Sequence, residues 1–278
     1  MDPRPWWQVN IAFPDWATAE HTAVTHLAPI MAQAEDEQIV ISWFFTRKTP
    51  CWRVRYVPSS GRAHGYLRHH LDDLIRQGHV GTATEVLYEP ETHAFGGGEA
   101  MRCAHALFHL DSRYLLAHLA SSPGVEHRRE LSILLCTALL RSAGLDWYEQ
   151  GDVWGRVADH RDLPHPIPPE RRHTLEASVR QLMSVDAGPL LRDGAPLGFA
   201  ANWSAAFDAT GYKLAALATK GLLHRGLRAV LAHHIVFAWN RLGLPYTAQA
   251  VLAHTAKQIV FGCDPTGAQI EETRSKTS

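Results

Sequence analysis

The sequence predicts an α+β protein in which a small antiparallel or mixed sheet, packed with helices, forms the N-terminal part and a mostly helical half follows. Over the first hundred residues, runs typical of strands and helices alternate in the order strand, helix, strand, strand, helix, strand. From Glu99 onward, almost all apolar residues recur at helical spacing. We expect one domain over residues 1–278, with a sheet-rich part at 1–100, a helical part at 101–262 and a frayed tail at 263–278.

Composition narrows the class of protein. The chain has 278 residues, of which 46% are hydrophobic, so it is long and apolar enough for a large core. Its 27 basic and 28 acidic residues leave a net charge of −1. Proteins that bind nucleic acid through its phosphates show an excess of basic residues, so we expect no direct nucleic-acid partner. The N-terminus lacks the features of a signal peptide, and no apolar run is long enough to span a membrane. We therefore expect a cytoplasmic protein.

The four cysteines, Cys51, Cys103, Cys136 and Cys263, lie far apart and form no CxxC pair. This spacing argues against a disulfide framework and against a zinc site. We expect them to be reduced and half-buried.

A β-hairpin over Ile39 to Tyr56 is the strongest local prediction. β-Branched and aromatic residues crowd both halves, and Pro50 cannot lie inside a central strand, so the turn falls at residues 48–50. Because side chains alternate along a strand, Arg53 and Arg55 point to one face, and the face opposite them carries Trp52, Val54 and Tyr56.

Two arginines about 7 Å apart on one face repel each other unless that face is well solvated or holds an anion. The first alternative is a solvent-exposed sheet face. The second is a site for a carboxylate-bearing ligand, which arginine binds with two parallel hydrogen bonds. The residues of the hairpin alone leave both open.

The other elements of the first part follow from capping residues and periodicity. We expect a strand at 6–13, a helix from an N-cap at Asp15 to Gln38, a surface loop at 59–65 and a strand at 82–90. Between the last two lies an amphipathic helix that ends at Gly78 and whose apolar face comprises Leu67, Leu71, Leu74 and Ile75.

A glycine-rich loop follows at 88–100. Gly96, Gly97 and Gly98 permit backbone conformations closed to other residues, and a helix that begins near Glu99 turns free N–H groups toward the loop. This arrangement predicts either an anion cradle or only a tight connection, because the phosphate-binding pattern GxxxxGK[ST] is missing.

The remaining chain is expected to form a helical bundle. The predicted helices are 99–119, 128–144, 147–160, 170–184, 199–220, 224–242 and 246–261. The proline-rich stretch 160–173 is predicted to be a loop.

Four stretches together resemble one family, the C-terminal domain of lantibiotic dehydratases, also called the thiopeptide-type bacteriocin biosynthesis domain. WFFTRKTPCWRVRY resembles the family's hairpin with its Arg-x-Arg pair, and YEPETHAFGG resembles its Y-E-P-E…R-Y-G-G loop. HLDSRYLLAHL is similar to its F-x-x-D-S helix, and HHIVFAWNRLGL to its late H-M-H…N-R-L helix. The four stretches follow one another in the family's order.

The resemblance implies maturation of ribosomally made peptides, without a metal or organic cofactor. Family members eliminate glutamate from glutamylated Ser or Thr to give dehydroalanine or dehydrobutyrine, and we expect this lyase activity. Standalone relatives in thiopeptide pathways instead join two dehydroalanines by a formal [4+2] cycloaddition that builds a pyridine. A non-catalytic subunit that binds the precursor or its partner is a third alternative. The implied partners are a leader-bearing precursor peptide, a separate glutamylating dehydratase subunit and, as one possibility, a second copy of the chain.

Elimination needs the glutamate to be held by its carboxylates, a base for the α-proton and a donor for the leaving group. By resemblance, Arg53 and Arg55 match the family's arginine pair, and Glu91 matches its loop glutamate. The family's loop arginine falls on Ala94, where His93 is a partial substitute. The family's late-helix histidines fall on Val236 and Ala238, so we expect protons to be moved by His93, His233 or His234.

Further substrate contacts are expected from Arg47, Tyr148, Asn240 and Arg241, the last two of which match the family. An arginine near a helix C-terminus also interacts with the helix dipole, which is the alternative for Arg241. Asp111, Ser112 and Arg113 are expected to brace the loop or the hairpin, because residues two apart on a helix do not face each other. Trp154 is expected in the core.

Overall fold

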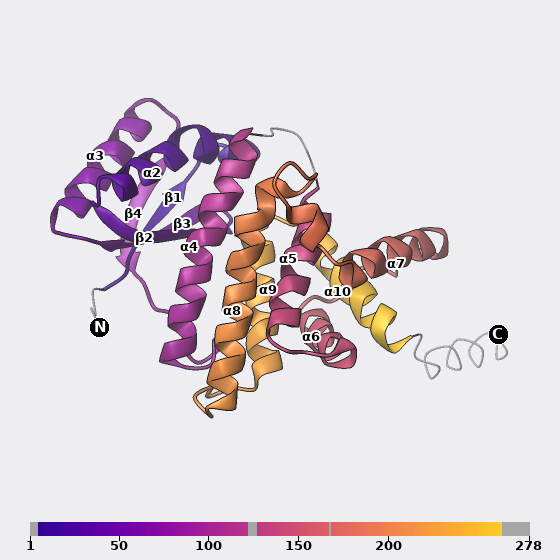
Figure 1. Cartoon of the computed structure of the whole chain (residues 1–278). Coiled ribbons are helices and arrows are strands. Elements are labelled where there is room, and N and C mark those ends of the chain that lie inside the picture. The colour runs from indigo at the N-terminus through magenta and orange to yellow at the C-terminus, as the bar shows by residue number, and fades with distance from the viewer. Residues whose placement is uncertain (1–4, 122–126, 167, 263–278) are drawn as a thin grey trace, which may run out of the picture.

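The computed structural model describes residues 5–121, 127–166 and 168–262. The sheet of this part of the chain has four antiparallel strands in the order β2-β3-β1-β4 (Figure 1). The strands are β1 Trp7–Ala12, β2 Val40–Lys48, β3 Cys51–Pro58 and β4 Thr82–Leu87. The predicted α+β class and the hairpin, with its turn at Thr49 and Pro50, are confirmed.

The apolar face of the sheet forms the core of the N-terminal part. The side chains of this face alternate along the strands and are buried: Val9, Ile11, Trp43, Phe45, Trp52, Val54 and Tyr56. The helices α2 (Ala28–Asp36) and α3 (Arg62–Arg76) pack against this side of the sheet (Figure 1). The leucines predicted for the apolar face of α3 are buried there, so that helix is confirmed.

Two boundaries in this part differ from the prediction. The first helix begins at Ala19 as α1 (Ala19–Thr22), and Asp15 accepts a hydrogen bond from the Ala17 amide at 2.9 Å instead of capping a helix. It continues through a π-helical turn, Ala23–Leu27, directly before Pro29, which cannot donate to the carbonyl four residues earlier. The predicted surface loop at 59–65 is partly wrong, because α3 already begins at Arg62.

The helical part agrees with the predicted helices to within a few residues. Its helices are α4 Gly98–Ser121, α5 Arg128–Ser142, α6 Trp147–Asp159, α7 Pro169–Ser184, α8 Ala201–Thr219, α9 Leu227–Leu242 and α10 Tyr246–Phe261. α9 packs against α4, α5, α6, α8 and β2, and is therefore central (Figure 1). Trp154 is fully buried against Trp239 of α9, which confirms its place in the core.

Three of the four cysteines lie within the described residues. Cys51 and Cys103 are half-buried and free, whereas Cys136 is fully buried in α5, so the expectation of half-burial is wrong for it. Cys263 and the predicted tail lie outside the described residues. Within the described ranges, every helix is too short or too polar to cross a membrane.

Candidate functional site

The polar face of the sheet carries a buried cation. Arg55 on β3 is 8% exposed, and it donates from Nε to Gln8 Oε1 at 2.7 Å and from Nη1 to Thr46 Oγ1 at 2.9 Å. Its guanidinium carbon lies 4.8 Å from the ring centre of Tyr88 and 5.2 Å from that of Phe44. Burial lowers the pKa of Arg55 to about 10, so it stays cationic at neutral pH. The solvent-exposed alternative for this face is therefore wrong for Arg55.

Arg53 shares this face and is half-buried. It stands opposite Asn10 on β1 and Thr46 on β2. Among the charges that act on the pKa of Arg55, Arg53 lowers it and Glu91 raises it. The two arginines therefore form one positive surface, with the Glu91 carboxylate as a nearby counter-charge.

Glu91 and His233 lie near Arg55. Together with Arg53, these residues form what we call the Arg55 cluster. Glu91 Oε2 lies 3.0 Å from His233 Nε2, and this hydrogen bond is the main cause that holds the pKa of Glu91 below its usual value. The positive charges of Arg55 and Lys48 lower this pKa further. An ionised Glu91 only accepts, so His233 Nε2 carries the shared hydrogen, and in a neutral imidazole the lone pair is then on Nδ1.

The glycine loop brings these residues together. Gly96 and Gly97 have φ angles of 88° and 109°, and a Cβ on Gly96 would lie 2.9 Å from Val230 at the start of α9. The His224 amide donates to the Gly96 carbonyl at 2.9 Å. Only glycine permits both the backbone conformation and this approach. The loop is thus a tight connection that packs against α9 and places Glu91 beside His233, which supports the second of the two predictions for it.

A tyrosine and a histidine that the sequence analysis did not select lie next to Arg55. Tyr88 Oη is 2.9 Å from His105 Nε2 on α4, and the ring of Trp6 is 4.4 Å from that of His105. Burial raises the pKa of Tyr88 to about 12 and lowers that of His105 to about 4, so the phenol donates to a neutral imidazole. His105 is one of 18 histidines, and nothing in its local sequence separates it from the others.

The three predicted proton-moving histidines have different surroundings. His93 is exposed in the loop, whereas His233 lies against the ring of Phe95. His234 is completely buried beside Phe95 and Phe108, and burial lowers its pKa to about 3. Neither ring nitrogen of His234 has a hydrogen-bond partner among the described residues. Of the three, His233 is the one that the structure joins to Glu91.

Arg241 belongs to the core. It is fully buried, with Nε 2.5 Å from Asp111 Oδ2, and Trp203 Nε1 donates to the other oxygen of Asp111 at 2.8 Å. These contacts join α9 to α4 and α8, so the geometry favours a structural role for Arg241 over the predicted substrate contact. The expected bracing role fits Ser112, because its Oγ accepts a hydrogen bond from the Phe45 amide of β2 at 3.3 Å.

Two further predicted residues, Arg47 and Asn240, line a separate cavity of about 430 Å³ beside Arg161 and Tyr246. Arg47 forms an ion pair with Glu20, and its Nε donates to the carbonyl of Arg241 at 2.8 Å. The ion pair attaches β2 to α1, and the hydrogen bond attaches β2 to the end of α9.

Tyr148 is 66% exposed at the start of α6, a helix that packs against α9 and α10. It therefore lies on a different element from the Arg55 cluster. Within the described ranges, no three His, Cys, Asp or Glu side chains are grouped so that they could share a metal ion.

Solved structures share this fold at low sequence identity. The tRNA-dependent lantibiotic dehydratase MibB from Microbispora sp. 107891 matches with a TM-score of 0.69 and 17% identity, over 99% of this chain and 29% of MibB. TsrL matches with a TM-score of 0.63 and 14% identity, over 94% of this chain and 97% of TsrL. The pyridine synthase TbtD from thiomuracin biosynthesis matches with a TM-score of 0.64 and 11% identity, over 92% of this chain and 97% of TbtD.

At the level of sequence, no curated protein matches the chain. The chain spans less than a third of MibB, so the likeness to that protein concerns the fold of one part of it. The family model described as the lantibiotic biosynthesis dehydratase C-terminal domain matches residues 6–260. This match covers nearly all of the sequence, including the hairpin, the glycine loop and α9, and the chain therefore belongs to that family.

Proposed function

We propose that this chain matures a ribosomally made precursor peptide in the cytoplasm by eliminating glutamate from glutamylated Ser or Thr, and that it works with a separate glutamylating subunit. One observation carries the proposal. The buried cation Arg55 shares a sheet face with Arg53 and lies near a Glu91–His233 pair whose free imidazole nitrogen is suited to proton abstraction.

The steps of the reaction can be assigned to these groups. Arg53 and Arg55 bind the glutamyl carboxylate and the ester carbonyl, where charge-assisted hydrogen bonds stabilise developing negative charge. His233 Nδ1 takes the α-proton, and Glu91 stabilises the resulting imidazolium. As the Cα–Cβ double bond forms, the Cβ–O bond breaks and glutamate leaves as a carboxylate. His233 then returns its proton to solvent.

The family's missing loop arginine has a neighbour that partly replaces it. Arg225, from the connection between α8 and α9, donates from Nη1 to the carbonyl of Ala94 at 3.1 Å. A guanidinium thus lies at the loop position where the family's own arginine would stand. However, one N–H group of Arg225 is already bonded to the backbone, so fewer of its donors can bind a ligand.

Pyridine formation is the second candidate. The fold of this chain matches 97% of TsrL and 97% of the pyridine synthase TbtD. Beside Arg55 lies an aromatic cluster in which the partly exposed rings of Trp6 and Tyr88 are 6.2 Å apart, and such rings can stack on the flat azoles of a thiopeptide precursor. A non-catalytic precursor-binding subunit is the third candidate.

Mass spectrometry on two synthetic peptides separates the three candidates. One peptide carries a glutamyl ester on serine, and the other carries two dehydroalanines behind a leader segment. Loss of glutamate from the first peptide supports elimination, and ring formation with release of the leader from the second supports cycloaddition. Binding of either peptide without a change in mass supports the non-catalytic subunit and contradicts our proposal.

A further inference from the structure

The outer edge of β4 is open and lies beside a hollow. β4 is at one end of the sheet, and within the described part of the chain it pairs with β1 alone. Its sequence TATEVL contains no proline or lysine, and its register with β1 is unbroken over six residue pairs. Edge strands of monomeric proteins are usually protected by such residues or by a bulge, so this edge is suited to accept another strand.

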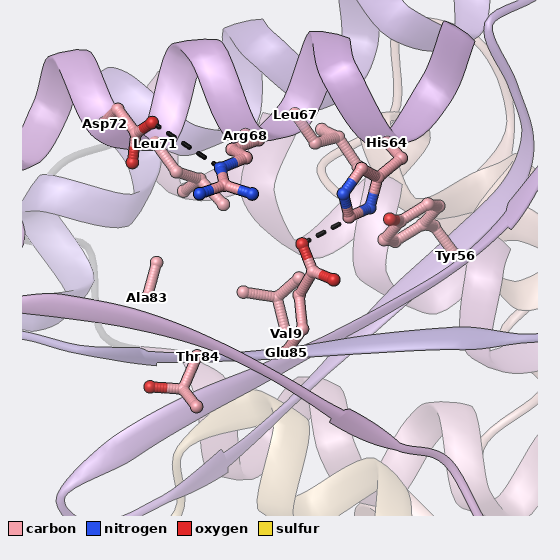
Figure 2. A pocket seen from close by; sticks show the side chains of 10 residues that line it. All are labelled: Val9, Tyr56, His64, Leu67, Arg68, Leu71, Asp72, Ala83, Thr84 and Glu85. Atoms are coloured by element: carbon pink, nitrogen blue, oxygen red, sulfur yellow. Dashed lines mark ion pairs between the residues drawn. The ribbon is translucent and has the colours of Figure 1, made fainter. Parts of the chain in front are cut away.

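The hollow lies between α3 and this edge and has a volume of about 290 Å³ (Figure 2). Val9 of the sheet forms its apolar floor, Leu67 and Leu71 of α3 form the wall that faces it, and His64 lies 3.3 Å from Glu85 at one side. A second hollow of about 350 Å³ also includes His64 and continues past Trp7. The two hollows meet at Tyr56 and His64 and form one groove, which borders β4 at Ala83, Thr84 and Glu85 and then runs past Trp7 toward Pro58 at the end of β3.

The residues along this groove are exposed where a bound strand would cover them. Leu87 is 82% exposed, and its register partner Trp7 is 41% exposed. Arg68 is 70% exposed on the α3 wall, and the nearest oxygen of Asp72 is 3.9 Å from its Nε. Arg68 is thus loosely held and lies over the hollow, where it can pair with a carboxylate of a ligand (Figure 2).

The end of β4 leads directly to the candidate site. Tyr88, whose ring lies beneath the Arg55 guanidinium, is the residue after Leu87, and Glu91 follows three residues later. The six residues of β4 span about 20 Å. A chain that lies along this edge is therefore aimed at the Arg55, Glu91 and His233 cluster.

We propose that β4 binds an extended segment of the precursor peptide by strand addition, which rests on the proposed function. The segment precedes the reacting residue in the peptide and runs parallel to β4, so that the next residues reach the cluster. Its side chains alternate between the groove and the opposite face, with apolar residues above the floor and a carboxylate at Arg68. Main-chain hydrogen bonds supply the affinity, and the groove selects the side chains.

The test uses as the probe a fluorescein-labelled decapeptide in which valine and threonine alternate and glutamate replaces one central valine, so that the carboxylate lies on the same side of the strand as the valines and can reach Arg68. We expect saturable binding in fluorescence anisotropy, and a loss of at least about tenfold in affinity when alternate amides of the probe are N-methylated, because strand addition needs them. Arg68→Glu should weaken binding by at least about tenfold through like-charge repulsion. The matched control Lys213→Glu makes the same change of charge at an exposed position on α8, away from the groove, and should stay within about twofold. Hydrogen exchange of β4 amides should slow when the probe binds.

Other results overturn the proposal. The proposal is contradicted if the probe shows no saturable binding to the parent. It is also contradicted if the N-methylated probe binds as tightly as the unmodified probe, or if Arg68→Glu binds the probe as tightly as the parent. A dimer of the chain that the probe does not dissociate would show that the edge belongs to a second copy. The proposed function fails separately. A glutamylated tripeptide is too short to reach β4, so Arg68→Glu and the parent should process it equally, whereas Arg55→Lys should not. If no peptide is processed, the proposed function fails, but the binding results still test strand addition.

Discussion

Glu91 and His233 are 142 positions apart in the chain, and their side chains meet at 3.0 Å on the polar side of the sheet. The contact joins the loop after β4 to the middle of α9. Because Glu91 is ionised, it fixes which imidazole nitrogen carries the hydrogen. The pair therefore fixes the position of the base that our proposal requires and the ring nitrogen that faces Glu91.

The first prediction concerns the titration of Glu91. The pKa of Glu91 in the folded protein is lowered, chiefly by the hydrogen bond with His233. NMR of the Glu91 carboxyl carbon should therefore show a titration midpoint below 4.5 in the parent and a higher midpoint in His233→Gln. The pair stabilises the fold above the pKa of the unfolded state, and this contribution is lost as pH falls through the lowered pKa. Because Glu91 is half-exposed, the contribution is only about 0.5 kcal/mol. An unchanged midpoint in His233→Gln would contradict the assignment.

The second prediction separates the two arginines. Arg55→Lys loses the bonds to Gln8 and Thr46, so it should lower the free energy of unfolding by about 1–3 kcal/mol and slow glutamate release by about 100-fold. Arg53→Lys should keep the parent stability within about 0.5 kcal/mol, because Arg53 is half-exposed. Urea denaturation and timed release of glutamate measure the two effects. Parent-like release by Arg55→Lys would exclude it from the site.

The sequence predicted the elements of the fold well because their signals are local. The alternation in β3 placed Arg53 and Arg55 on the face opposite Trp52, and the periodicity of the second half located the helices almost residue by residue. The first helix was predicted less well, because Asp15 accepts the Ala17 amide in a turn and the helix begins only at Ala19.

The site was predicted only in part because its partners come from distant segments. Glu91 and Arg55 were expected from the family motifs, but nothing local distinguished His233 from His234, whose burial depends on Phe95 and Phe108. The partner of Arg241 was missed for the same reason. A buried arginine and an exposed one look alike in sequence until the carboxylate opposite is known.

The third prediction concerns the buried pair of Asp111 and Arg241. Asp111→Asn leaves an uncompensated buried guanidinium, so the free energy of unfolding should fall by about 3–5 kcal/mol in urea denaturation. Asp72→Asn, an exposed change of the same kind on α3, should alter it by less than about 0.5 kcal/mol. If the two variants were equally stable, Arg241 would not be held in the core by Asp111.

The fourth prediction concerns His234. Its folded pKa of about 3 lies below its usual value of 6.5, so the unfolded chain binds a proton that the folded protein excludes. This group therefore destabilises the fold progressively as pH falls from 6.5 toward 3, by about 2 kcal/mol at pH 5. Comparison of thermal unfolding at pH 7 and pH 5 should show a smaller loss for His234→Phe than for the parent. Identical losses would mean that His234 is protonated in the folded protein.

The measurement that tests the central claim most directly is single-turnover release of glutamate from a peptide with a glutamyl ester on serine, followed by mass spectrometry. The parent and the loop control His93→Gln should both convert the peptide to a product one water lighter than the unmodified peptide. His233→Gln should slow this conversion by about 100-fold, because the α-proton has no base. Equal rates for the parent and His233→Gln, or no release of glutamate by the parent, would contradict the account.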